Sequence, residues 1–304
     1  MTTPRTGRGA RGAADGPVAR GAGVGPVVGA PGAPSDETRL ARLRWAAGDA
    51  ATITRRYLTH LRSAPERAVM ALALPLVFTL LFVYVLGSNM LVPEGASYVD
   101  FLIPGMLAQM TVFGVAASAS AVADDKDKGI SDRFHSLPMS RTGVPVGQSL
   151  AEILGGLITL TVMAGCGLLV GWRPDASAPR IVAAFALLVF ARYAFGWLGM
   201  WLGLVLPSRS STELIGMLTF PLTMVSNVFV PTGGLPAGLR PIAEWNPVSA
   251  VVSAVRELFG LPVAGPGGAG WPQDHPVAAA VAWSFLLLAV FGPLTVSAFR
   301  APKH

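Results

Sequence analysis

The most charged run of this sequence is a single polar segment. The run extends from Asp124 to Pro138 and lies between two long apolar stretches, 98–123 and 150–171. It mixes acidic and basic residues and is longer than the minimum needed to turn the chain around. We interpret it as a surface on which another protein docks. A solvated turn that only connects the two stretches is the alternative.

Residue types that carry other chemistry are few and scattered. The single cysteine, Cys166, can build neither a disulfide framework nor a thiolate metal site within one chain. The histidines lack the spacing of metal ligands; they are His60, His135, His275 and His304. No lysine stands in the G-x-x-x-x-G-K-S/T spacing of a phosphate-binding loop. We therefore expect no catalytic residue, no metal and no bound cofactor, and an energy source outside this chain.

The composition indicates a membrane protein. Of the 304 residues 52% are hydrophobic and only 13% are charged, whereas a soluble domain is about 25% charged. A helix that crosses a bilayer needs about 20 mostly apolar residues. The stretches of that length lie at 67–86, 98–123, 150–171, 180–206, 212–230 and 277–299. The predicted fold is an all-α integral membrane protein with six transmembrane helices within residues 67–300.

The distribution of basic residues predicts the orientation. Arginines crowd the segment before the first span, so we expect both termini in the cytoplasm. Residues 1–34 are rich in Gly, Ala, Pro and Arg and are predicted to be a disordered cytoplasmic tail. Loop 124–149 is then cytoplasmic and segment 231–276 extracellular. Since topology explains the net charge of +6, nucleic-acid binding is not indicated.

Residues 35–66 are predicted to form an amphipathic interfacial helix. At about 100° per residue, apolar side chains share one face and polar ones the other. The polar face carries Arg44, Arg55, Arg56 and Arg62. Such a helix can lie among lipid headgroups, with its arginines near anionic lipid. Whether its polar face also touches a cytoplasmic partner stays open.

Within the charged loop, residues 129–137 are predicted to form a short helix that Pro138 ends. Ile130, Phe134 and Leu137 follow i, i+4 and i+7 spacing and share one side. A short helix with one apolar stripe and flanking charges can press into a groove on another protein.

The charged loop carries Lys128-Gly129, Arg133-Phe134 and Leu137-Pro138-Met139-Ser140-Arg141, and Asn246-Pro247-Val248 with Arg256 follows the fifth predicted span. With these motifs, the order of elements resembles the permease subunit of ABC type-2 exporters, and more narrowly the daunorubicin-resistance type of bacterial drug-efflux permease, in which a signature similar to the second motif precedes the last span. The likeness covers about residues 40–299. The sequence departs from the family at Asp127, where Glu is common, and at Gln148, where Lys is common.

The resemblance implies a mechanism. The charged loop would be a coupling helix in a cleft of a separate ATP-binding-cassette ATPase, present in two copies and carrying the ATP and Mg. The permease would work as a homodimer in the bacterial cell membrane, with hydrophobic small-molecule cargo such as a drug or antibiotic passing between protomers. The expected coupling residues are Lys128, Gly129, Ile130, Asp132, Arg133, Phe134, Leu137 and Pro138. Phe134 would be the knob in the partner's groove.

A few polar or adaptable side chains inside the predicted spans are candidates for the translocation path, because ionisable groups in a membrane are costly. They are Gln109, Phe113, Arg192, Met224 and Asn227. For Arg192 the alternative is a structural pair with a glutamate or with carbonyl oxygens. For the others it is packing between helices.

Segment 231–276 contains an apolar piece, 248–261, that is too short to span. We expect one or two re-entrant or interfacial helices there. Trp245 and Trp271 suit a membrane interface.

Two other classes of function remain. An ion-driven secondary transporter would need a buried relay of acidic or histidine residues, which the spans lack. A non-transporting scaffold would use the same loop only as a tether. Within the exporter class, lipid or polysaccharide is the alternative cargo.

Overall fold

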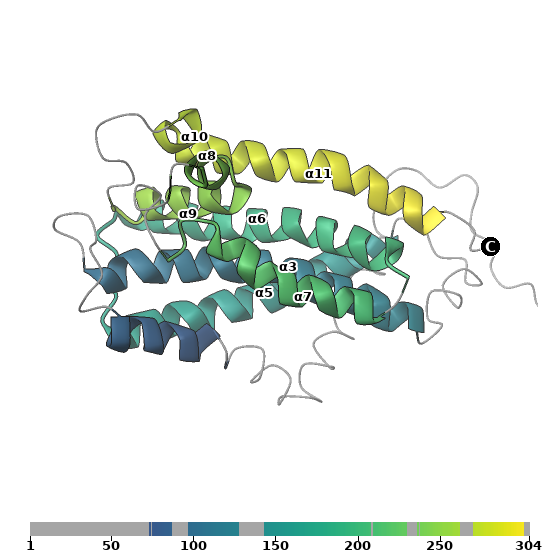
Figure 1. The fold of residues 1–304 in the computed structure, drawn as a ribbon, viewed down its shortest axis with the longest axis horizontal. Helices are drawn as coiled ribbons and strands as arrows, with labels where there is room; N and C mark the ends of the chain where they lie inside the picture. The colour runs from purple at the N-terminus through teal and green to yellow at the C-terminus, as the bar shows by residue number, and fades with distance from the viewer. Residues whose placement is uncertain are drawn as a thin grey trace, which may run out of the picture. The chain divides into compact units, whose positions relative to one another are not determined.

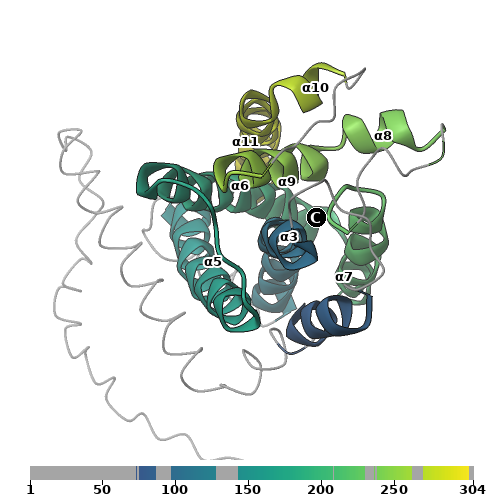
Figure 2. The same ribbon diagram turned by 90° about the vertical axis from the view of Figure 1, so that its left-hand side faces the viewer.

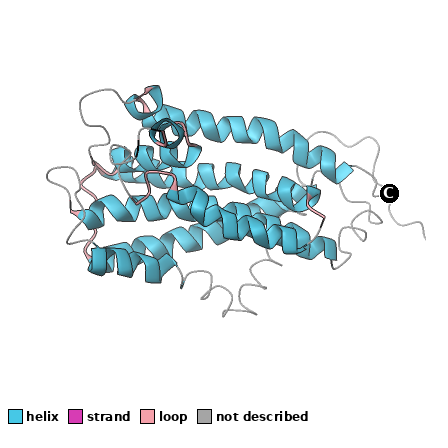
Figure 3. Cartoon of the chain, viewed as in Figure 1, coloured by secondary structure: helices cyan, strands magenta, loops and turns pink. Residues whose placement is uncertain are grey.

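The structure, a computed structural model, describes residues 73, 75–86, 97–127, 143–207, 209–229, 236, 238–261 and 270–300. Every regular element in these ranges is a helix (Figure 3). The predicted tail and interfacial helix, with Arg44, Arg55, Arg56 and Arg62, lie outside the described residues. So do the coupling residues between Lys128 and Pro138.

Within these described ranges, four helices are long and apolar enough to cross a membrane. They are α3 (Tyr98–Asp127), α5 (Gly143–Val170), α6 (Ala178–Val205) and α11 (Pro276–Arg300). They match the predicted spans 98–123, 150–171, 180–206 and 277–299. Helix α3 continues through Asp127 and α5 begins at Gly143, so both helices extend into the predicted loop 124–149.

The two remaining predicted spans are described only in part or are shorter than expected. Residues 75–86 of the first form an apolar helix that ends in the π-helix η1 (Phe82–Leu86). The fifth corresponds to α7 (Arg209–Met224), a helix of 16 residues that ends before the predicted end at 230. The total of six spans and the orientation of the termini therefore stay predictions.

Helix α3 lies at the centre of the described part of the chain. It packs against α5, α6, α7 and α9, and Figure 2 shows it with α5 on one side and α7 on the other. Its closest neighbour is α6, where a Cβ on Gly199 would lie 2.3 Å from the Val115 carbonyl oxygen, and one on Gly203 2.6 Å from that of Ala119. Glycine at these positions lets the two backbones approach, as in many membrane helix pairs.

Between α7 and α11 the residues that the structure describes form three short helices (Figure 1), α8 (Arg240–Glu244), α9 (Pro247–Leu258) and α10 (Trp271–Asp274). Asn246 caps α9, since its side chain accepts a 2.9 Å hydrogen bond from the Val248 amide, and Pro247 suits the first helical position. Helix α9 packs against α3, α6 and α11, and residues 248–256 are all buried. The predicted short helix in this segment is thus present, inserted among the long helices.

Candidate functional site

Arg192 joins three of the long helices. From α6 its Nη1 donates to the Met110 carbonyl of α3 at 2.9 Å, and its Nε donates to the Glu152 carbonyl of α5 at 3.3 Å. The Glu152 carboxylate lies 3.6 Å from Nη2. Only 9% of Arg192 is exposed. These contacts are those of the structural pair that the sequence left as the alternative, while a role in the translocation path stays a prediction.

Two glycines make room for the Arg192 side chain. A Cβ on Gly156 would lie 2.1 Å from Arg192 Cδ, and a Cβ on Gly114 3.2 Å from its Nη1. The sequence reasoning did not identify either residue. The available signal was the position of Gly156 one helical turn after Glu152 on α5, which places the two on one face.

Arg256 on α9 makes a second set of ties, to main-chain oxygens. Its Nε and Nη2 donate to the Phe101 carbonyl at 3.0 and 2.9 Å. Its Nη1 donates to the Asn227 carbonyl at 2.7 Å, and Nη2 donates also to the Val228 carbonyl at 2.9 Å. The guanidinium carbon lies 3.5 Å from the centre of the Phe101 ring, a cation–π contact. One side chain thus holds α9, the start of α3 and the turn after α7 together.

The local sequence explains why the Asn227 and Val228 carbonyls are open to Arg256. Helix α7 ends at Met224, which leaves the carbonyls of the following turn without helical partners. Burial lowers the pKa of Arg256 to about 9, so the guanidinium remains protonated at neutral pH.

A buried polar chain extends from this arginine. The side-chain Nδ2 of Asn227 donates to Ser253 Oγ at 2.7 Å, and the backbone N–H of Asn227 donates to Ser249 Oγ at 3.2 Å. Ser253 then donates to Gln273 of α10 at 3.3 Å. The sequence signal was the spacing of Ser249, Ser253 and Arg256, which are i, i+4 and i+7 and form a polar stripe on α9. The sequence reasoning did not use it.

The remaining path candidates lie in different environments. Gln109 donates to Thr223 Oγ1 at 3.1 Å, which ties α3 to α7, and both side chains are buried. Phe113 is partly buried against the core. Met224 is 39% exposed and belongs to α7, whose other exposed apolar side chains are Leu214, Met217, Leu218 and Leu222. Thus Gln109, Arg192 and Asn227 have hydrogen-bond partners within the chain, and Met224 faces outward.

At the edge of the charged loop, the last turn of α3 is tied to α6. Lys126 Nζ donates to the Leu206 carbonyl at 3.1 Å. Asp127 is the final residue of α3, and Gln148 lies in α5. The loop is therefore bordered directly by two of the helices that Arg192 joins.

Comparison with known proteins places these features in a family. Residues 50–259 match the family model described as ABC-2 type transporter. The daunorubicin resistance ABC transporter permease protein DrrB1 of Streptomyces coeruleorubidus is 30% identical over 260 residues, which cover 82% of this chain and 88% of that protein. The probable doxorubicin resistance ABC transporter permease protein DrrC of Mycobacterium tuberculosis H37Rv is 22% identical, over 83% of this chain and 88% of that protein.

The match spans most of the long helices and the two arginine clusters between them. It confirms the resemblance on which the expected function depended, and together with the four apolar helices it indicates a multi-pass membrane protein. Proteins of this family are transporter subunits rather than enzymes by themselves. This chain belongs to the ABC-2 type transporter family, as a membrane permease subunit.

Proposed function

We propose that this chain is the membrane subunit of a bacterial exporter that moves a hydrophobic small molecule, such as a drug or antibiotic, out across the plasma membrane. The family supports an exporter permease. The cargo class is supported by the relatives, whose names refer to daunorubicin and doxorubicin resistance. Two copies of the chain form the translocation path, and two copies of a separate ATPase bind the ATP and Mg²⁺ that drive it.

The observation that carries this mechanism is the set of contacts around Arg192. Helices α3 and α5 border the charged loop on either side, and Arg192 of α6 hydrogen-bonds to both. A displacement of the loop by the ATPase is therefore passed to three helices that move together, rather than absorbed by one. Rigid-body motion of packed elements is a common form of such transitions.

Phe134 is the proposed contact with the ATPase, with Lys128, Asp132 and Arg133 as charges around it. Phe134→Ala should reduce both drug efflux and co-purification of the ATPase, because it removes the apolar anchor of the docking helix. The matched control is Leu169→Ala, which truncates a 90% exposed side chain at the opposite end of α5. Unchanged efflux and unchanged co-purification in Phe134→Ala would remove this role from Phe134.

The alternative functions predict different requirements for the ATPase. Cellular drug accumulation is measured with and without this chain, each with and without the ATPase gene. An exporter lowers drug accumulation only when both genes are present. An ion-driven carrier lowers drug accumulation without the ATPase gene, and a scaffold does not lower it in any of the four strains. Export of lipid or polysaccharide leaves drug accumulation unchanged and alters the envelope instead.

A further inference from the structure

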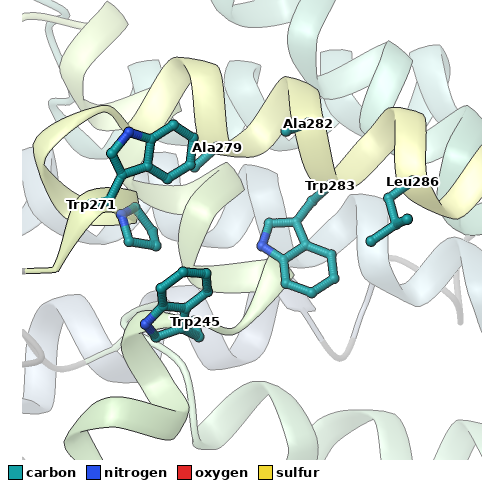
Figure 4. A pocket seen from close by; sticks show the side chains of 7 residues that line it. Trp245, Trp271, Ala279, Ala282, Trp283 and Leu286 are labelled. Atoms are coloured by element: carbon teal, nitrogen blue, oxygen red, sulfur yellow. The ribbon is translucent and has the colours of Figure 1, made fainter.

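An aromatic pocket lies where the short helices meet α11. Its volume is about 160 Å³, and its lining residues are Trp245, Trp271, Pro272, Ala279, Ala282, Trp283 and Leu286. Trp245 follows α8, Trp271 and Pro272 begin α10, and the others lie on the first turns of α11. Figure 4 shows the indoles of Trp245, Trp271 and Trp283 around one shared space beside α11.

The size and chemistry of the pocket restrict what fits. An apolar cavity of about 150 Å³ stays dry and holds one benzene-sized molecule, whereas pockets for drug-sized ligands are about 300–1,000 Å³. None of the described residues that line the space is charged, so these residues offer no partner to a charged headgroup. The pocket suits a short stretch of alkyl chain and is too small for a whole drug molecule.

The surroundings of the pocket favour lipid as the source of that alkyl chain. Leu286 is 50% exposed, and Val290 and Leu294 continue the exposed apolar surface of α11 at intervals of four residues, on one helical face. Helix α11 is a candidate membrane span, so this stripe faces hydrocarbon. Trp245 and Trp271 are each about half exposed, as suits indoles at the level of lipid headgroups.

We propose that this pocket binds one acyl chain of a membrane phospholipid, which enters along the exposed stripe of α11. The bound chain contacts Trp245, α10 and α11 together. Because Gln273 of α10 belongs to the hydrogen-bonded chain that leads to Arg256, the lipid also supports that buried network. The proposal goes beyond transport and depends on neither the ATPase nor the cargo.

The test uses the purified full chain in detergent micelles, titrated with phosphatidylcholine that carries bromine on its acyl chains. Bromine quenches tryptophan fluorescence on contact, so an occupied site gives quenching that saturates at a low lipid-to-protein ratio. Ala282→Phe fills the pocket from the exposed side of α11. We expect its half-saturating lipid concentration to rise about tenfold, as when about two methylene groups are no longer buried.

The matched control is Ala289→Phe, which adds the same ring to an exposed position two turns along the same face of α11, outside the pocket. Its titration should match that of the wild type. Equal titrations for the two variants, or wild-type quenching that rises without saturation, would overturn the proposal in favour of ordinary contact with surrounding lipid. If Ala282→Phe is not folded by size-exclusion chromatography, Trp245→Ala tests the opposite wall, and an unchanged titration there also overturns it.

Discussion

Helices α3 and α11 are both long enough to cross a membrane, yet they occupy opposite environments. In the most apolar stretch of α3, 83% of the residues are buried, against 17% in that of α11. The more buried helix is the less apolar one, with a mean hydropathy of 1.5 against 2.2. In a bilayer the surroundings are themselves apolar, so polar groups lie inside the protein, where they find partners.

The more buried helix, α3, also makes more hydrogen bonds to other helices than α11 does among the described residues. Helix α3 accepts hydrogen bonds from Arg192 and Arg256, and its Gln109 bonds to Thr223. On α11, Thr295 donates to the Trp197 carbonyl of α6 at 3.2 Å. The exposed large apolar side chains of α11 are Phe285, Leu286, Val290 and Leu294. We infer that α3 carries the connections on which the fold and the coupling depend, and that α11 mainly contacts lipid.

The largest expected effect is the loss of Arg256. Arg256→Met leaves the carbonyls of Phe101, Asn227 and Val228 buried without this donor, at a cost of about 4 kcal/mol. The melting temperature in detergent, followed by intrinsic fluorescence, should fall by about 10 °C. Arg180→Met, which removes an exposed arginine from α6, is the control and should stay within about 0.5 kcal/mol of wild type. Equal melting temperatures for the two variants would mean that Arg256 does not hold α3.

A matched pair of leucine truncations compares the two helices directly. Leu107 of α3 is fully buried, whereas Leu294 of α11 is 40% exposed. Leu107→Ala should cost about 2 kcal/mol, because it leaves a cavity in packed protein. Leu294→Ala should cost well under 1 kcal/mol, since lipid can fill the space. Thermal melts of the two variants decide the point, and a larger loss in Leu294→Ala would reverse the proposed roles of the helices.

The smallest expected effect concerns the space around Arg192. Gly156→Ala forces the Arg192 side chain to move, because the new methyl would overlap Cδ and Nε, and should cost about 1 kcal/mol through weakened hydrogen bonds. Gly165→Ala on the same helix meets no atom within 4 Å and should be neutral or slightly stabilising, since alanine favours helix. Comparison of their melting temperatures tests the contact. An unchanged melting temperature in Gly156→Ala would show that the Arg192 side chain can move away from the new methyl group without loss of stability.

Hydropathy alone predicted six spans, and four of them coincide with long helices of the described residues, although the helices do not end where the predicted spans end. Asp124, Asp125 and Asp127 are polar, so the predicted span stopped at residue 123, although the helix continues to Asp127. The apolar residues of a sequence indicate which part of a helix contacts lipid, but the backbone hydrogen bonds of the helix can continue beyond that part. Conversely, the predicted fifth span extended to residue 230 because its residues are mostly apolar, while α7 ends at Met224. The turn that follows is held by α9, which is distant in sequence.

The arginine clusters were only partly predictable. The cost of a charge in the membrane identified Arg192 and named a glutamate or carbonyl oxygens as its alternative partners. Arg256 was noted only through a family signature, because its partners are backbone oxygens, which no pattern of side chains reveals. The space that Gly156 leaves for Arg192 likewise depends on how α5 and α6 pack, which local sequence does not determine.

The most direct test of the proposed mechanism is transport by purified components in vesicles. The chain is reconstituted into inside-out proteoliposomes, alone or with its ATPase, and daunorubicin accumulation inside the vesicles is followed by fluorescence after ATP and Mg²⁺ are added. We expect accumulation only when both proteins and ATP are present, since no lysine of the sequence stands in the spacing of a phosphate-binding loop. Uphill accumulation by the chain alone would contradict the account.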